Sequence, residues 1–75
     1  MRNQSLMRQW RLLKLLAKKP ATPYELATHF TESLRTIYKD IEALKQVDFP
    51  IKTKRVETGR FYYLDIKLLK LILDD

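Results

Sequence analysis

Four polar residues gather at the start of a helical pattern in the middle of the chain: Arg35, Thr36, Tyr38 and Lys39. Their hydroxyl, guanidinium and ammonium groups can donate hydrogen bonds to phosphate oxygens and to the edges of bases. Apolar residues recur beside them at spacings typical of the buried face of a helix, namely Ile37, Ile41 and Leu44. The polar set is therefore expected at the helix start and on its outer face, where it can reach a partner.

The composition favours a polyanionic partner and gives no support to an enzyme. The chain of 75 residues is long enough for one domain, and its 15 Lys and Arg residues exceed its 9 Asp and Glu residues, a net charge of +6. This charge suits nucleic acid or an anionic membrane surface. The chain has no cysteine, one histidine (His29) and one glycine. It therefore offers no thiolate metal site, no glycine-rich phosphate loop and no pair of groups for acid–base or nucleophilic catalysis. We expect no metal, no cofactor and no catalytic residue.

Location follows from two further features of the sequence. The absence of cysteine fits a reducing compartment. The leucine-rich segment near the N-terminus is interrupted by lysines and closed by Pro20, so it resembles neither a signal peptide nor a membrane span. The expected location is cytoplasmic.

Three helices with short connections are expected in the first two thirds of the chain. Residues 4–19 form an amphipathic pattern whose inner face is Leu6, Trp10, Leu13, Leu16 and Ala17, and whose solvated face is Arg8, Arg11, Lys14 and Lys18. The segment from Thr22 to Glu25 matches a capping box, with proline at the first helical position. This second helix turns Leu26, Ala27 and Phe30 inward. Ser33 can cap a third helix that runs to about Gln46, and the two form a helix-turn-helix.

The rest of the chain predicts a β-hairpin and a fourth helix. Val56 and the aromatic residues 61–63 favour strands, and Gly59 favours a turn between them. The hairpin carries four cations, Lys52, Lys54, Arg55 and Arg60. The predicted fold is mainly α with a β-hairpin. It is a winged helix-turn-helix domain over residues 1–64, followed by a C-terminal helix over 65–75 that serves dimerisation or begins a linker.

The motifs RLLKLL, YELATHF, SLRTIYKDIEAL, FPI and YYL resemble the N-terminal winged-helix domain of bacterial regulators that carry a C-terminal WYL domain. DeoR-type regulators and the biotin-operon repressor are similar, more loosely. The resemblance covers roughly residues 8–64. It implies sequence-specific binding of double-stranded DNA by a transcriptional regulator or by its DNA-binding domain. It also implies that the equivalents of Ser33, Arg35, Thr36, Tyr38 and Lys39 face the DNA.

The chain departs from this pattern at four places. The family pattern usually has glycine at the positions of Thr31 and Asp48, and an apolar residue at the position of Glu32. Its wing is also usually richer in glycine than the wing of this chain. Asp48 can adopt a left-handed conformation at low cost. Glu32 is expected to point outward or to pair with a nearby cation such as Arg35, because a buried carboxylate without a partner is costly.

Other interpretations of the same features remain open. A winged helix can serve as a protein-interaction module without reading DNA, and the basic first helix with Trp10 could lie on a membrane surface. Tyr38 fits a structural role as well as a DNA contact. The residues Phe61, Tyr62 and Tyr63 are expected to pack in the core, His29 to lie on the surface, and the cations of the first helix to serve solubility more than phosphate binding.

The last helix predicts a homodimer. Its apolar residues cover most of its circumference, and exposed apolar patches of this kind usually mark interfaces. We assign Ile66, Leu69 and Leu73 to the monomer core and Leu68, Leu71 and Ile72 to the partner surface. The competing explanation is that a further domain of a longer protein covers this helix.

Overall fold

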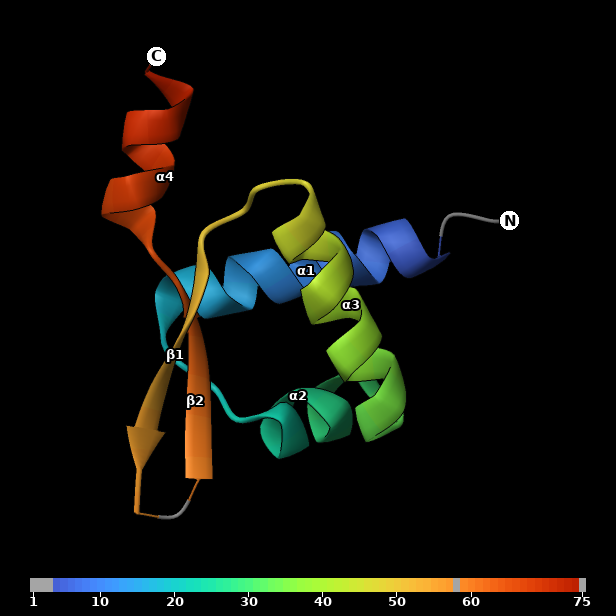
Figure 1. Ribbon diagram of the computed structural model, residues 1–75. Coiled ribbons are helices and arrows are strands. Elements are labelled where there is room, and N and C mark those ends of the chain that lie inside the picture. Colours follow the sequence, from blue (N-terminus) through green and yellow to red (C-terminus); the bar gives the residue numbers. More distant parts are fainter. Residues whose placement is uncertain (1–3, 58, 75) are drawn as a thin grey trace.

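The computed structural model describes residues 4–57 and 59–74, and it confirms the predicted order of elements. The helices are α1 (Gln4–Lys18), α2 (Pro23–Phe30), α3 (Leu34–Gln46) and α4 (Ile66–Leu73), and the hairpin is β1 (Ile51–Val56) with β2 (Gly59–Leu64). In Figure 1, α1 runs behind α3, α2 lies below them, the hairpin stands to one side, and α4 extends away from the rest. This is a winged helix-turn-helix fold with an added C-terminal helix.

Local capping interactions fix the ends of α2 and α3. Thr22 accepts a hydrogen bond from the backbone of Glu25, and the Glu25 carboxylate accepts one from the backbone of Thr22, which completes the predicted capping box. Ser33 caps α3 by accepting from the backbone N–H of Thr36. Thr31 (φ 54°) and Asp48 (φ 72°) both adopt positive φ. The two positions where the family pattern usually has glycine are therefore the left-handed residues that follow α2 and α3.

The core lies where α1, α2, α3 and the base of the hairpin meet. Its buried members are Leu12, Leu13, Leu16, Leu26, Ile37, Ile41, Leu44, Ile51, Tyr62 and Leu64. Among the three hairpin aromatics, Tyr62 belongs to this core, while Phe61 and Tyr63 are half-buried. The predicted packing role of the hairpin aromatics is therefore confirmed most fully for Tyr62.

The predicted inner face of α1 was wrong in part. Leu12 is fully buried together with Leu13 and Leu16, whereas Leu6, Trp10 and Ala17 are exposed, Trp10 by 58%. The exposed residues fall on a flank of the helix beside its core-facing line, because α1 turns 100° per residue. The Lys14 ammonium lies 5.9 Å from the centre of the Trp10 ring, which places this flank beside a solvated cation.

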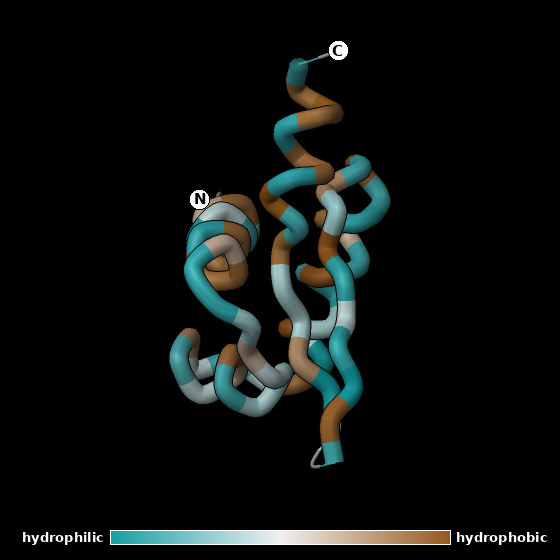
Figure 2. The backbone as a smooth tube through the Cα atoms, turned by 90° about the vertical axis from the view of Figure 1, so that its left-hand side faces the viewer, coloured by the Kyte–Doolittle hydropathy of each residue, from teal (hydrophilic) through white to brown (hydrophobic). Residues whose placement is uncertain are grey.

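The prediction for the core face of α4 was also wrong in part. Leu69 packs against the core, but Ile66 and Leu73 are exposed, Leu73 by 72%, and no residue of α4 is buried. The backbone N–H of Asp65 bonds the carbonyl of Pro50, and α4 then leaves the domain. Figure 2 shows this helix as a mostly apolar segment that projects beyond the body of the molecule. A helix that points outward cannot bury a whole face against its own domain.

Candidate nucleic-acid interface

The orientation of α3 sets its outer surface. Ile37, Ile41 and Leu44 are buried, so the helix presents Arg35 and Lys39 on the opposite side, where both are exposed. Arg35 and Lys39 are four residues apart and therefore lie one turn apart on the same face. The structure thus brings the two predicted cations of this helix together.

Ser33 and Thr36 are joined to each other at the start of α3. The Ser33 hydroxyl donates to the Thr36 hydroxyl at 3.1 Å, in addition to accepting from the Thr36 backbone. The Ser33 side chain therefore acts as a helix cap, and its hydroxyl proton is donated to Thr36. The Thr36 hydroxyl keeps its own proton for an external acceptor.

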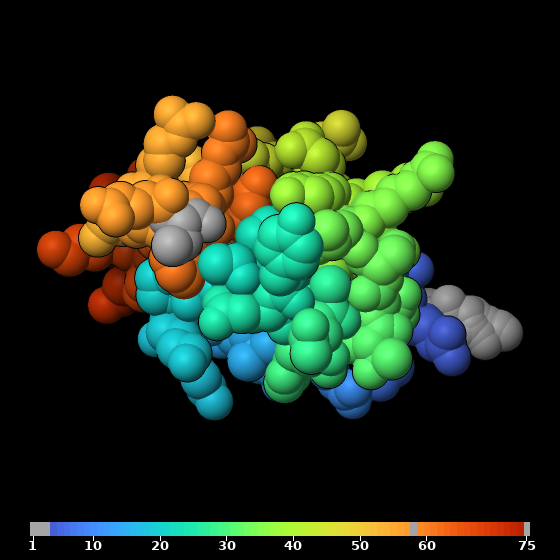
Figure 3. All heavy atoms as spheres, turned by 90° about the horizontal axis from the view of Figure 1, so that it is seen from below, coloured from blue at the N-terminus to red at the C-terminus, as the bar shows by residue number. Residues whose placement is uncertain are grey.

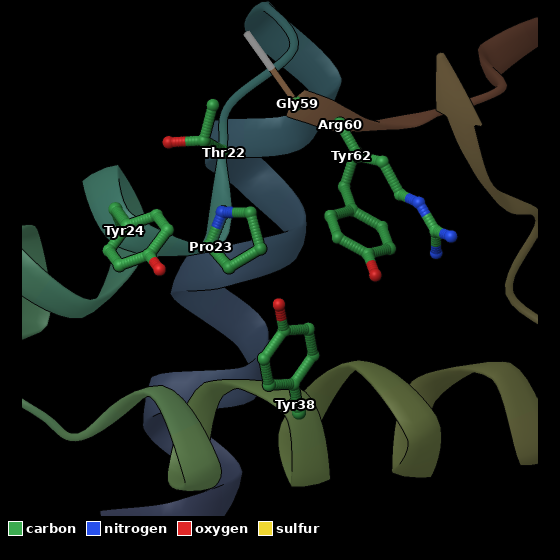
Figure 4. Close-up of a pocket in the computed structure, with 7 residues that line it drawn as sticks. All are labelled: Thr22, Pro23, Tyr24, Tyr38, Gly59, Arg60 and Tyr62. Atoms are coloured by element: carbon green, nitrogen blue, oxygen red, sulfur yellow. The ribbon is translucent and has the colours of Figure 1, made fainter. Parts of the chain in front are cut away.

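Tyr38 is not part of the core. Its side chain is 45% exposed and lines a cleft between α2, α3 and the hairpin. Figure 4 shows its hydroxyl pointing across this cleft, away from the axis of α3. This partly exposed position is compatible with both roles predicted for Tyr38, a structural one and a DNA contact.

The four hairpin cations divide between two faces. Arg55 pairs with Arg60 across the two strands. Arg60 and the buried Tyr62 are two residues apart on β2, so they lie on the same face of the hairpin. Both arginines therefore lie on the face that turns toward α3. Lys52 pairs with Tyr63, and Lys54 with Phe61, on the other face. All four cations are exposed. Seen from below in Figure 3, side chains of α3 and of the hairpin project from the same side of the molecule, with α1 on the opposite side.

A buried ion pair connects α1 to α3, and the sequence reasoning missed it. Asp40 is buried, with only 3% of its surface exposed. Its carboxylate accepts two hydrogen bonds from the Arg8 guanidinium and one from the Gln9 amide. Arg8 also donates to Glu32 at 3.3 Å, so the predicted pairing of the exposed Glu32 with a cation is confirmed, with Arg8 in place of Arg35 as the partner. Arg8 was assigned to the solvated face. The available signal was the place of Asp40 on the inner side of α3.

The ion pair stabilises the charged form of Arg8. The hydrogen bond to Asp40 raises the pKa of Arg8, burial opposes this, and the charges of Asp40 and Glu32 add to the rise. Arg8 thereby compensates the negative charges of Asp40 and Glu32.

The remaining predicted features have simple positions. His29 is exposed and its ring lies edge-on to Phe30, with centroids 4.8 Å apart. Within the described residues, no group of acidic, histidine or cysteine side chains could hold a metal ion. No helix in the described part of the chain has the length and apolar character needed to cross a membrane.

The residues that were predicted to form a dimer interface are exposed or half-buried on α4. Leu71 is 69% exposed, Ile72 is exposed and Leu68 is half-buried. Leu68 and Ile72 line a groove formed with the segment that joins α3 to β1. Lys67 and Lys70 are the cations of this helix and are exposed.

Comparison with known proteins agrees with this architecture. The solution structure of a homodimeric winged helix-turn-helix DNA-binding domain (fragment 1–100) from Mycobacterium bovis, a possible ArsR-family transcriptional regulator, is similar with a TM-score of 0.68 and 22% sequence identity. The similarity covers 96% of this chain and 74% of the other, and at this identity it shows a shared fold. No curated protein matches the sequence. A family model described as an HTH domain matches residues 8–59. The chain therefore belongs to this family of helix-turn-helix domains.

Proposed function

We propose that this protein binds double-stranded DNA in a sequence-specific manner, without catalysis, as a transcriptional regulator or as the DNA-binding domain of one. One observation carries the proposal. The outer face of α3 carries the exposed cations Arg35 and Lys39, and side chains of α3 and of the cation-bearing hairpin project from the same side of the molecule (Figure 3). A helix fits the major groove, and its first turns must carry the side chains that reach base edges. The DNA-binding domain from M. bovis has the same fold, which supports the proposal.

Each part of this surface has a role in the proposed complex. Arg35 and Lys39 donate to guanine or to phosphate, and Thr36 and Tyr38 bond phosphate or pack on a thymine methyl group. Ser33 holds the start of α3 in place. The cations Lys52, Lys54, Arg55 and Arg60 lie along the phosphate backbone. The motif SLRTIYKDIEAL further supports a relation to regulators with WYL domains, and this finer assignment is part of the proposal.

Selection from a pool of randomised duplexes tests the proposed function. We expect an enriched sequence that the protein binds about 10³-fold or more tightly than random DNA at physiological salt. If no sequence is enriched and random duplexes bind weakly, the fold serves another purpose, and capture of a protein partner by α4 becomes the better explanation. Equal and tight binding of all duplexes would leave DNA binding but remove sequence specificity.

Replacing Arg35 with alanine should reduce discrimination between the selected site and random DNA. A bidentate contact between an arginine and a base contributes roughly 1–3 kcal/mol of discrimination. We expect Arg35→Ala to lose that amount on the selected duplex and much less on random DNA, measured by fluorescence anisotropy. The matched control is Arg11→Ala, because Arg11 is an exposed arginine on α1. If Arg35→Ala weakens both duplexes equally, Arg35 contacts phosphate only.

The two faces of the hairpin should differ in their effect on salt dependence. Each phosphate contact contributes about 0.9 to the slope of log affinity against log salt. Replacing Arg55 and Arg60 with glutamine should lower this slope by up to about 1.8, because both side chains face α3. The Lys52 and Lys54 pair, replaced in the same way, should lower it less. An unchanged slope in both double variants would place the hairpin away from DNA.

We also propose that two copies associate through α4. Leu68, Leu71 and Ile72 present apolar surface that the described part of the domain does not cover fully. A twofold dimer places two recognition helices on one side of a duplex, which suits a short helix that reads few bases. The M. bovis domain is described as homodimeric, and this supports the proposal.

A further inference from the structure

The cleft beside Tyr38 is lined by three tyrosines and one arginine among its seven residues. It measures about 290 Å³ and is formed by Thr22, Pro23 and Tyr24 at the start of α2, Tyr38 of α3, and Gly59, Arg60 and Tyr62 of β2. Among the described residues, no carboxylate lines it. Its charged group is the guanidinium of Arg60, and its other strong polar groups are hydroxyls (Figure 4).

Backbone pairing holds the walls of the cleft together. The N–H of Ala21 donates to the carbonyl of Tyr62 at 2.9 Å, and the N–H of Tyr62 donates to the carbonyl of Ala21 at 2.8 Å. This pairing fixes the start of α2 against β2. The cleft is therefore formed before any partner binds, and the cost of ordering it is already met by folding.

Two of the three tyrosine hydroxyls in the cleft, those of Tyr38 and Tyr62, are available to a ligand between α3 and β2. Tyr62 is only 7% exposed, and Figure 4 shows its hydroxyl directed toward α3, as the Tyr38 hydroxyl is directed toward α2 and β2. None of the side-chain hydrogen bonds found within the described residues uses either hydroxyl. No buried polar side-chain atom in that part of the chain lacks a partner, so the Tyr62 hydroxyl meets solvent in the cleft.

These groups suit an anion. A guanidinium and two phenol hydroxyls can all donate hydrogen bonds to phosphate oxygens, and bonds from a charged donor to an anion are the stronger ones. The backbone N–H groups of Thr22 and Glu25 at the start of α2 are not available to the anion, because each donates to the side chain of the other residue. The three side chains therefore present donors to the cleft, and no carboxylate in the described lining opposes an anion.

The position of the cleft identifies the anion. If α3 lies in the major groove and the hairpin lies over the adjacent groove, the sugar–phosphate backbone between the two grooves must pass between α3 and the hairpin. The cleft lies between these two elements. We infer that it seats one phosphodiester group of the DNA backbone, held by Arg60 and by the hydroxyls of Tyr38 and Tyr62. This inference rests on the proposed function. Such a contact fixes the register of the protein on the duplex and carries no sequence information itself.

Methylphosphonate scanning of the selected duplex tests the inference. Each substitution replaces one charged phosphate oxygen with a methyl group. With wild-type protein, we expect one position in each half-site to weaken binding by roughly 10-fold or more through loss of the contacts in the cleft. In the variant with Tyr38→Phe and Tyr62→Phe, the effect of the same position should fall measurably but not to zero, because Arg60 still contacts that phosphate, while other phosphates keep their effects. Both rings are retained, so the variant should keep its Tm.

The controls separate this inference from the proposed function. Tyr63→Phe is the matched control, because Tyr63 is half-buried on the other face of β2, and it should leave the scan unchanged. If the double variant shows the same scan as the wild type, the phosphate seat is wrong although DNA binding stands. Saturable binding of inorganic phosphate alone, with no change in DNA affinity on removal of the hydroxyls, would assign the cleft to a free anion and also overturn the inference. Failure of every duplex to bind would instead remove the proposed function.

Discussion

Replacing Leu71 with glutamate is expected to convert a dimer into a monomer. Leu71 is 69% exposed in the single chain, so the substitution removes no core contact. Burial of one leucine side chain contributes about 1.5–3 kcal/mol. A twofold interface contains the residue twice, which raises the expected loss to about 3–6 kcal/mol. The dimer should therefore dissociate at least about 100-fold more readily, which sedimentation equilibrium at micromolar concentration measures.

A neighbouring substitution controls for the change of charge. Lys70 is exposed on the polar side of α4, and Lys70→Glu should leave the dimer intact. Leu68 is the less suitable site because it is half-buried and its loss would disturb the single domain. A wild-type protein that sediments as a monomer with full helical content would contradict the dimer. It would favour the alternative in which another domain of a longer protein covers α4.

Replacing Arg8 with methionine is expected to destabilise the domain by about 3–5 kcal/mol. The side chain of Asp40 is 4% exposed and that of Arg8 is 16% exposed. Removal of the arginine would leave a buried carboxylate with only the Gln9 amide as a partner. Domains are stable by only about 5–15 kcal/mol, with small ones at the low end. The loss is therefore a large part of the whole free energy of unfolding, and urea denaturation would detect it.

A double variant distinguishes the loss of the pair from the loss of packing. Arg8→Met combined with Asp40→Leu removes both charges, and it should recover much of the lost stability because no unpaired charge remains. Arg11→Met changes an exposed arginine on the same helix and should stay within about 0.5 kcal/mol of the wild type. If Arg8→Met is as stable as Arg11→Met, the ion pair contributes nothing to the fold.

Features with a local cause could be predicted from the sequence. The starts of α2 and α3 follow from Thr22 and Ser33, whose side chains bind backbone groups three residues away. The buried face of α3 follows from a regular apolar spacing. The exposure of Arg35 and Lys39 follows in turn, because residues opposite a buried stripe face outward. For these elements the local sequence and the final structure agree.

Features that depend on distant segments could not be predicted in the same way. The partner of Asp40 is Arg8, which lies 32 positions earlier, and no spacing rule connects two such residues. The cleft beside Tyr38 exists because Ala21 pairs with Tyr62. In α4, apolar residues surround most of the helix, so the pattern alone does not tell which ones meet the core. Only Leu69 does so among those assigned to it.

The most direct test of DNA recognition by α3 is a map of the contacted surface in solution. Uniformly ¹⁵N-labelled protein is titrated with the selected duplex, and amide chemical shifts are followed by NMR. We predict the largest changes at residues 33–39 of α3 and at residues 52–60 of the hairpin, with small changes over the first two turns of α1. The largest changes in α1 or α4, with α3 unaffected, would contradict the assignment of α3 as the recognition helix.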